Sequence, residues 1–125
     1  MNKRKGGFTI IEIIIVVTMI AILATLTIFA FSNWRARTAK TEMRNESAQA
    51  WIALKNYRVF NGAYPANQTA FNAVYKVGSA VTLTYTTPDS GTTYCIAATS
   101  VNDTSVWYVG SSTQQPTTTK PSNCP

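Results

Sequence analysis

The sequence predicts an α+β fold in which one long N-terminal α-helix packs on a small three-stranded antiparallel β-sheet. Two observations carry this prediction. No glycine or proline occurs between Phe8 and Val59, so the ordinary helix breakers are missing from a stretch of about 50 residues. After Pro65, three short segments with strand-like composition are separated by turn residues, which is the pattern of a small antiparallel sheet. With 125 residues, the chain has room for one ordinary domain at most.

The first part of the predicted helix is long and apolar enough to cross a lipid bilayer. Residues 8 to 31 carry one charged side chain, and 24 residues at about 1.5 Å each span about 36 Å. A secretory signal peptide is one alternative, but its apolar core is only about 7 to 15 residues long. A plain membrane anchor is a second alternative, with the basic residues Lys3, Arg4 and Lys5 on the cytoplasmic side. The length of the run excludes the signal peptide and agrees with the anchor.

Glu12 is the charged side chain in this run, and a plain anchor does not explain it. A charge within hydrocarbon costs about 2.5 to 3.5 kcal/mol, so such carboxylates normally have a partner. We find none within the segment, because the nearest cations are Lys5 and Arg35. Cleavage between Gly7 and Phe8 would create an ammonium group on Phe8, at i,i+4 helical spacing from Glu12. The same amine can instead meet Glu12 of a neighbouring copy displaced along a common axis, and that pairing builds a filament.

The segment KGGFTIIEIIIVV resembles the processing site and opening helix of type IV prepilins, including the related pseudopilins of type II secretion. It combines a short basic leader, a glycine before the cleavage point, an aromatic first residue and a glutamate at the fifth mature position. The resemblance implies cleavage after Gly7 by a membrane-embedded prepilin peptidase that also methylates the amine of Phe8. It also implies that Phe8 and Glu12 set the register of subunits in a helical homo-oligomeric filament, which an assembly platform builds with its ATPase machinery.

The same resemblance implies the type IV pilin fold and a structural function rather than an enzymatic one. The subunit is expected to cross the cytoplasmic membrane once, with its N-terminus in the cytoplasm. After assembly it is expected in an extracellular filament for adhesion, twitching motility or DNA uptake. The opening motif does not separate this pilin from the alternative, a pseudopilin of a type II secretion or competence system. A membrane-anchored binding module that is never cleaved is an alternative of a different class.

These expectations divide the chain into four parts. Residues 1 to 7 form the leader peptide, and residues 8 to 31 form the transmembrane helix that becomes the filament core. Residues 32 to 60 continue this helix in amphipathic form. Residues 61 to 125 form a globular β-sheet domain whose last segment is bounded by a disulfide.

The amphipathic part of the helix has one small, apolar face. Its members recur at helical spacing and are Ala36, Ala39, Met43, Ser47, Ala50, Leu54 and Tyr57. We expect this face to pack on the rest of the domain. Asn61-Gly62 suits the left-handed conformation that ends a helix. Residues 69 to 77 suit a short second helix, with Thr69 as its N-cap and Gly78 as its stop.

Three segments predict the strands of the sheet. Residues 81 to 86 alternate apolar side chains with threonines, which is the period of a strand with one buried face. The segments TTYCIAATS and SVWYVGS supply two further strand candidates, joined through Asn102-Asp103. We therefore expect an antiparallel meander whose apolar face lies across the long helix.

Cys95 and Cys124 are the two cysteines of the chain, and both follow the apolar segment. That position places them in an oxidising exterior, where a disulfide is expected. The bridge would also tether the last fifteen residues, which are too polar and proline-rich to fold alone. Two free thiols are the alternative. A catalytic or redox use is disfavoured, because no histidine or cationic cluster is available to activate Cys95.

The sequence predicts no catalytic, cofactor-binding or metal-ligating residues. It has no histidine, no glycine-rich phosphate loop and no HExxH or paired CxxC motif. Asp89 and Asp103 lie in turn contexts, where aspartate is common, and a calcium site that includes both is the alternative. The net charge is +6, and residues 3 to 5 supply half of it. The other positive charges are scattered along the chain, which argues against nucleic acid as a partner.

Overall fold

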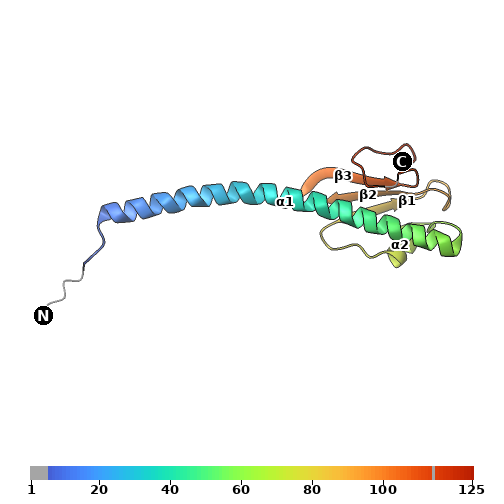
Figure 1. Cartoon of the computed structure of the whole chain (residues 1–125), viewed down its shortest axis with the longest axis horizontal. Coiled ribbons are helices and arrows are strands. Elements are labelled where there is room, and N and C mark those ends of the chain that lie inside the picture. The colour runs from blue at the N-terminus through green and yellow to red at the C-terminus, as the bar shows by residue number, and fades with distance from the viewer. Residues whose placement is uncertain (1–5, 114) are drawn as a thin grey trace. The chain divides into compact units, whose positions relative to one another are not determined.

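The computed structural model describes residues 6 to 113 and 115 to 125, which form two compact units divided between Trp34 and Arg35. The predicted leader therefore lies mostly outside the described residues, as does its basic cluster of residues 3 to 5. In chain order the elements are α1 (Ile10–Asn61), α2 (Gln68–Val74), β1 (Thr82–Thr86), β2 (Cys95–Ser100) and β3 (Asp103–Gly110) (Figure 1). The predicted α+β fold, with one long helix and a three-stranded antiparallel sheet, is confirmed.

Helix α1 runs without interruption for 52 residues, as the absence of glycine and proline predicted. It ends where the sequence indicated. Gly62 has a φ of 78°, and its backbone N–H donates to the carbonyl oxygen of Arg58 at 2.8 Å. A residue with a Cβ rarely adopts this left-handed conformation, which explains the glycine immediately after the helix.

The half of α1 that belongs to the unit of residues 35 to 125 buries one face. The fully buried members of the predicted face are Ala39, Met43, Ser47, Ala50 and Leu54. Ser47 is the polar member, and its hydroxyl group donates to the carbonyl oxygen of Met43 at 2.7 Å. Because this hydrogen bond satisfies the hydroxyl group, the helix can bury a serine without leaving an unpaired polar group in the core.

The sheet has the order β1-β2-β3, and both pairs of neighbouring strands are antiparallel. Leu83 of β1 lies opposite Ala98 of β2, and Ile96 of β2 lies opposite Val109 of β3. These side chains share one face of the sheet and form one hydrophobic core with Met43, Ala50 and Leu54 of α1. The alternation predicted for residues 81 to 86 is confirmed, since Val81, Leu83 and Tyr85 are buried.

The second helix is shorter than predicted, and both of its predicted ends are wrong. Its N-cap is Asn67 rather than Thr69, because the Asn67 side chain accepts a hydrogen bond from the backbone N–H of Ala70 at 2.8 Å. It ends at Val74, well before Gly78, because Tyr75 adopts an extended backbone conformation. Both asparagine and threonine cap helices, so the sequence alone left the choice of cap open.

Helix α2 also covers the free edge of the sheet. The Gln68 side chain accepts from the backbone N–H of Tyr85 at 2.6 Å and donates to the carbonyl oxygen of Leu83 at 3.3 Å. One side-chain amide thus replaces part of a missing neighbour strand along β1. Phe71 stacks on the Tyr85 ring with a centroid distance of 4.9 Å, so α2 is held to this edge by polar and apolar contacts.

The C-terminal segment is tied to the sheet at several points. Cys124 forms the predicted disulfide with Cys95 of β2, with Cα atoms 5.2 Å apart. Thr117 pairs with Tyr108 of β3 through two backbone hydrogen bonds of 2.7 and 2.9 Å. Asn123 lies so close to Gly110 that an added Cβ there would meet its side-chain amide at 2.9 Å. The segment is therefore packed against β2 and β3 despite its polar composition.

The disulfide is expected to supply a measurable part of the stability of residues 35 to 125. Replacing Cys124 by serine should lower the free energy of unfolding by about 3 to 4 kcal/mol, the loss expected when a loop of this length is opened. Urea unfolding of the full chain in detergent, followed by tryptophan fluorescence, measures the change. Reduced wild-type protein is the matched control and should lose a similar amount. A loss below about 1 kcal/mol in both would show that the other tail contacts hold the segment.

Candidate functional site

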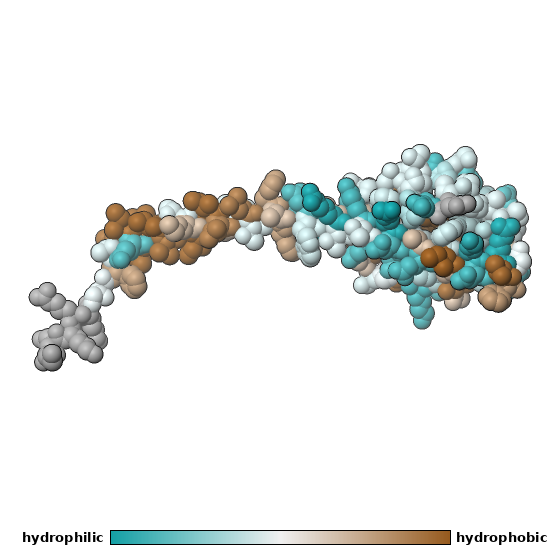
Figure 2. Space-filling view, in the orientation of Figure 1, coloured by the Kyte–Doolittle hydropathy of each residue, from teal (hydrophilic) through white to brown (hydrophobic). Residues whose placement is uncertain are grey.

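The first half of α1 exposes apolar side chains along its length. Every described residue from Gly6 to Trp34 is exposed within this chain, including Ile10 at 82% and Leu23 at 64%. Figure 2 shows apolar residues over the visible face of this stretch. Among the described residues, α1 is also the helix that is long and apolar enough to cross a membrane. So large an apolar surface needs either lipid or other protein helices around it.

The hydroxyl groups in this apolar stretch bond to the helix itself. Thr18 donates to the carbonyl oxygen of Ile15 and Thr25 to that of Ile22, both at 2.8 Å. Further bonds of the same kind run from Thr27 to Leu23 and from Ser32 to Phe29. Hydroxyl groups bonded in this way do not need water, so they are compatible with a lipid or helix-packed environment.

Glu12 has a partner within its own chain, which the sequence analysis missed. Its Oε2 atom accepts from the backbone N–H of Thr9 at 2.8 Å and from the Thr9 hydroxyl group at 2.9 Å. Thr9 Oγ1 in turn accepts from the backbone N–H of Glu12 at 3.4 Å. This reciprocal arrangement is a capping box at the start of α1. The spacing Thr9-x-x-Glu12 before an apolar run is its sequence signal and could have identified it.

Phe8 lies before helix α1, which begins at Ile10. The pairing of its amine with Glu12 stays a prediction, because that amine exists only after cleavage at Gly7. Residues 6 to 9 have no regular secondary structure, and the Phe8 side chain is 86% exposed. An added Cβ on Gly6 or Gly7 would meet no atom within 4 Å. Packing within the folded chain therefore gives no reason for these glycines. A backbone that has to enter the extended cleft of a protease would give one.

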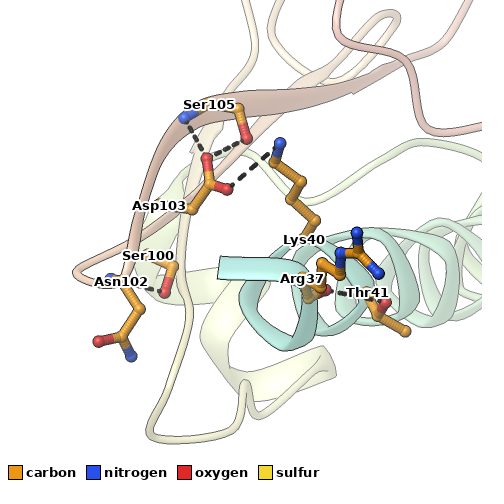
Figure 3. A network of polar contacts seen from close by, with 7 residues as sticks. All are labelled: Arg37, Lys40, Thr41, Ser100, Asn102, Asp103 and Ser105. Atoms are coloured by element: carbon orange, nitrogen blue, oxygen red, sulfur yellow. Dashed lines mark hydrogen bonds and ion pairs between the residues drawn. The ribbon is translucent and has the colours of Figure 1, made fainter. Parts of the chain in front are cut away.

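A second polar cluster holds the β2–β3 turn against α1 (Figure 3). Lys40 Nζ lies 3.7 Å from Asp103 Oδ2, and the Asp103 side chain is only 7% exposed. Asp103 Oδ1 accepts from the Ser105 hydroxyl group and from the Ser105 backbone N–H. These two bonds, and then Lys40, hold the pKa of the Asp103 carboxyl group below its ordinary value. Asp103 therefore fixes the start of β3 to the long helix.

The two aspartates considered for calcium are engaged in their own turns. Asp89 accepts a hydrogen bond from the Thr93 hydroxyl group at 2.9 Å. Asp103 is held by Lys40 and Ser105. Within the described ranges, no three His, Cys, Asp or Glu side chains gather in a group suited to a metal ion. Both aspartates thus have the turn role that their sequence contexts favoured.

Comparison with known proteins shows which proteins this chain resembles. Residues 2 to 28 match the family described as "Prokaryotic N-terminal methylation motif". "Fimbrial protein EcpC" of Eikenella corrodens is 30% identical over 99 residues, which cover 79% of this chain and 65% of that protein. A "Fimbrial protein" of Neisseria meningitidis serogroup A is 31% identical over 70 residues, covering 56% of this chain and 41% of that protein. "Type II secretion system core protein G" of Pseudomonas aeruginosa is 31% identical over 75 residues, covering 60% and 53%.

The matched region thus spans between 41% and 65% of the length of these three relatives. These relatives include fimbrial proteins and a secretion-system protein. The chain also has the methylation motif and an α+β fold with one long helix. The chain thus carries the N-terminal methylation motif and is similar both to fimbrial proteins and to a secretion-system protein.

The Asp103 cluster makes stability depend on pH. Because folding lowers the Asp103 pKa, its contribution is fully present above the ordinary value of 3.8 and is lost as pH falls through the lower folded-state value. Asp103→Asn should therefore unfold more easily than wild type at pH 7, and the difference should shrink towards pH 2. Urea unfolding at several pH values measures it, with Asp89→Asn as the control. A difference that stays constant down to pH 2 would contradict this role for the carboxylate.

Proposed function

We propose that this chain is a structural subunit of a type IV pilus. Its leader, residues 1 to 7, is removed by prepilin peptidase between Gly7 and Phe8, and the new Phe8 amine is methylated. Residues 8 to 31 hold the subunit in the cytoplasmic membrane and then form the core of an extracellular filament. Residues 32 to 60 continue the helix, and residues 61 to 125 form the outer domain. The observation that carries this proposal is an uncovered apolar helix that begins at a carboxylate held in place.

The capping box determines how Glu12 would meet its partner. Cleavage before Phe8 leaves the Thr9 amide intact, so the bonds from Thr9 to Glu12 Oε2 are compatible with the mature chain. Within the described part of the chain, Glu12 Oε1 accepts no hydrogen bond. One oxygen is therefore fixed by the subunit's own Thr9, and the other is available for the ammonium group of Phe8 on a neighbouring subunit.

The charge pair supplies specificity that the apolar surface does not. When a subunit leaves the bilayer for the filament, its apolar side chains move from lipid to other apolar helices. The hydrophobic effect gains little from that exchange, so packing and polar contacts decide the arrangement. An unpaired carboxylate in hydrocarbon is costly, and only one axial displacement of neighbouring helices brings Phe8 to Glu12. That displacement is the register of the filament.

Assembly requires other proteins, and their identity follows from this proposal. A prepilin peptidase processes the leader, and an assembly platform with an ATPase extracts subunits from the membrane. The similarity to the fimbrial proteins of Eikenella corrodens and Neisseria meningitidis supports a role in a surface filament. Such a filament would serve adhesion, twitching motility or DNA uptake.

A pseudopilin is the second candidate function, and the similarity to a type II secretion core protein favours it. Both candidates share the processing site and the Phe8–Glu12 pairing. They differ in the phenotype of a strain that lacks this chain. Loss of surface filaments with normal secretion supports the pilus, whereas retained filaments with defective secretion supports the pseudopilus.

The processing proposal predicts the mass of the purified protein. Its N-terminus should be Phe8 carrying one methyl group, because the amine remains cationic after methylation and can still pair with Glu12. Intact-mass spectrometry of protein from the native membrane or filament measures this directly. Gly7→Leu should leave the leader uncut, since a bulky side chain before the cleavage point hinders the extended backbone. An intact leader on wild-type protein in filaments would contradict the proposal.

Two variants separate the charge of Glu12 from its capping role. Glu12→Gln removes the charge but keeps an oxygen that accepts from Thr9, and it should lower filament yield at least about tenfold with membrane insertion unchanged. Thr9→Ala removes the capping hydroxyl group, costs about 1 kcal/mol of helix stability and keeps the charge, so assembly should persist. Quantifying sheared filaments and membrane-inserted subunits measures both. Equal filament yields from wild type and Glu12→Gln, with a loss in Thr9→Ala, would assign Glu12 to capping alone.

A further inference from the structure

Four basic side chains lie on one exposed face of α1 beside the core-packing face. They are Arg37, Arg44, Lys55 and Arg58. Arg37 and Arg44 are seven residues apart, as are Trp51 and Arg58, and residues at this spacing share a helix face. Arg37 and Arg58 are 21 positions apart, so the row is about 31 Å long at 1.5 Å per residue. Figure 2 shows hydrophilic residues along this part of the helix. We call these four residues the basic row.

The basic row has no carboxylate partners among the described residues. Lys40 lies on the same helix face, between Arg37 and Arg44, and is not counted in the row because it already pairs with Asp103 at 3.7 Å. Glu46 accepts a hydrogen bond from the Tyr75 hydroxyl group at 2.7 Å. Lys55 and Arg58 are like charges at i,i+3 spacing, which is unfavourable for an isolated helix. A row of unpaired like charges fits an anionic partner.

A second copy of this chain is a poor source of that anionic partner. Apart from Glu12 in the apolar segment, the chain has four carboxylates, namely Glu42, Glu46, Asp89 and Asp103. Three of them already bond within their own chain. Glu46 accepts from Tyr75, Asp89 accepts from Thr93, and Asp103 contacts Lys40 and Ser105. A flexible partner that carries many negative charges along its length would match such a row better.

One end of the basic row opens into a groove that also contains aromatic rings. Its walls are formed by Trp51, Lys55, Arg58, Val59, Gly62 and Tyr64. Lys55 Nζ lies 5.5 Å from the Trp51 ring centroid, and Arg58 Cζ lies 5.0 Å from that of Tyr64. Cations beside aromatic rings in an open groove are the combination by which proteins hold a phosphate and an unstacked base together.

We propose that the basic row binds single-stranded nucleic acid without sequence preference. Arg37, Arg44, Lys55 and Arg58 contact phosphate groups of one strand that lies along the helix. One base enters the groove and packs against the exposed parts of Trp51 and Tyr64. The positive charges scattered through the sequence thus include a set that α1 aligns. This binding assigns a site to the DNA uptake named among the proposed uses of the filament and in that respect rests on the proposed function. The contacts themselves do not depend on cleavage at Gly7.

The test uses the full chain purified in non-ionic detergent and a fluorescein-labelled DNA strand of about 30 nucleotides with mixed sequence. Fluorescence anisotropy measures the dissociation constant between about 50 and 300 mM NaCl. Arg44→Gln with Lys55→Gln should weaken binding at least about tenfold and reduce the slope of log K against log salt by about 1.4. Lys76→Gln with Lys120→Gln removes the same charge from exposed sites outside the row and should change binding less than about threefold.

A third variant tests the groove separately. Trp51→Leu should weaken binding with the salt slope unchanged, because it removes a ring and no charge. Circular dichroism and thermal unfolding check that each variant is folded. No binding by wild type at about 50 mM salt would overturn the proposal, as would equal losses in the two double variants. Loss of filament assembly in Arg44→Gln with Lys55→Gln, without loss of DNA binding, would instead make this face an interface between subunits.

Discussion

The contact between Thr9 and Glu12 is the constraint on which the assembly account depends. It fixes the start of α1 and holds the carboxylate at the first turn of an otherwise apolar helix half. A carboxylate at this position also suits the positive end of the helix dipole, so the isolated subunit tolerates it. Only one of its oxygens is used in this way. Under the proposed function, the other oxygen is the group that pairs with a neighbouring subunit.

The two units of the chain meet different physical demands. Residues 35 to 125 have a core of their own, in which one face of α1, one face of the sheet and Phe71 of α2 exclude water. The described residues from Gly6 to Trp34 are all exposed and contribute nothing to that core. Their side chains are thus free to be selected for lipid and for helix packing in a filament. The disulfide and the Asp103 cluster stabilise the folded unit of residues 35 to 125. Glu12 lies in the other unit, whose apolar side chains are exposed.

The features predicted correctly are those that depend on local sequence patterns. The absence of helix breakers predicted α1, Gly62 predicted its end, and the alternation around Leu83 predicted the buried face of β1. The pairing of Cys95 with Cys124 followed from there being only two cysteines. At the candidate site, one local motif supplied both Glu12 and the expected cleavage point, and the cleavage stays a prediction.

The features that the sequence did not predict are of two kinds. In one, two nearby residues suit the same role, and in the other, the contact joins residues far apart in the chain. Asn67 and Thr69 both suit an N-cap, and the packing of Phe71 on Tyr85 accompanies the choice of Asn67. The Lys40–Asp103 pair joins residues 63 positions apart, which no local pattern specifies. The Thr9–Glu12 capping box is different, because its signal was local. It was missed because Glu12 was considered only as a membrane charge in need of a cation.

A high-resolution electron cryomicroscopy map of the filament tests the central claim most directly, by giving the distance between the Phe8 nitrogen of one subunit and the Glu12 carboxylate of the next. We expect these atoms to lie within about 4 Å, with Thr9 still bonded to the other carboxylate oxygen. Well-separated groups, with each Glu12 bonded only to its own Thr9, would contradict the account.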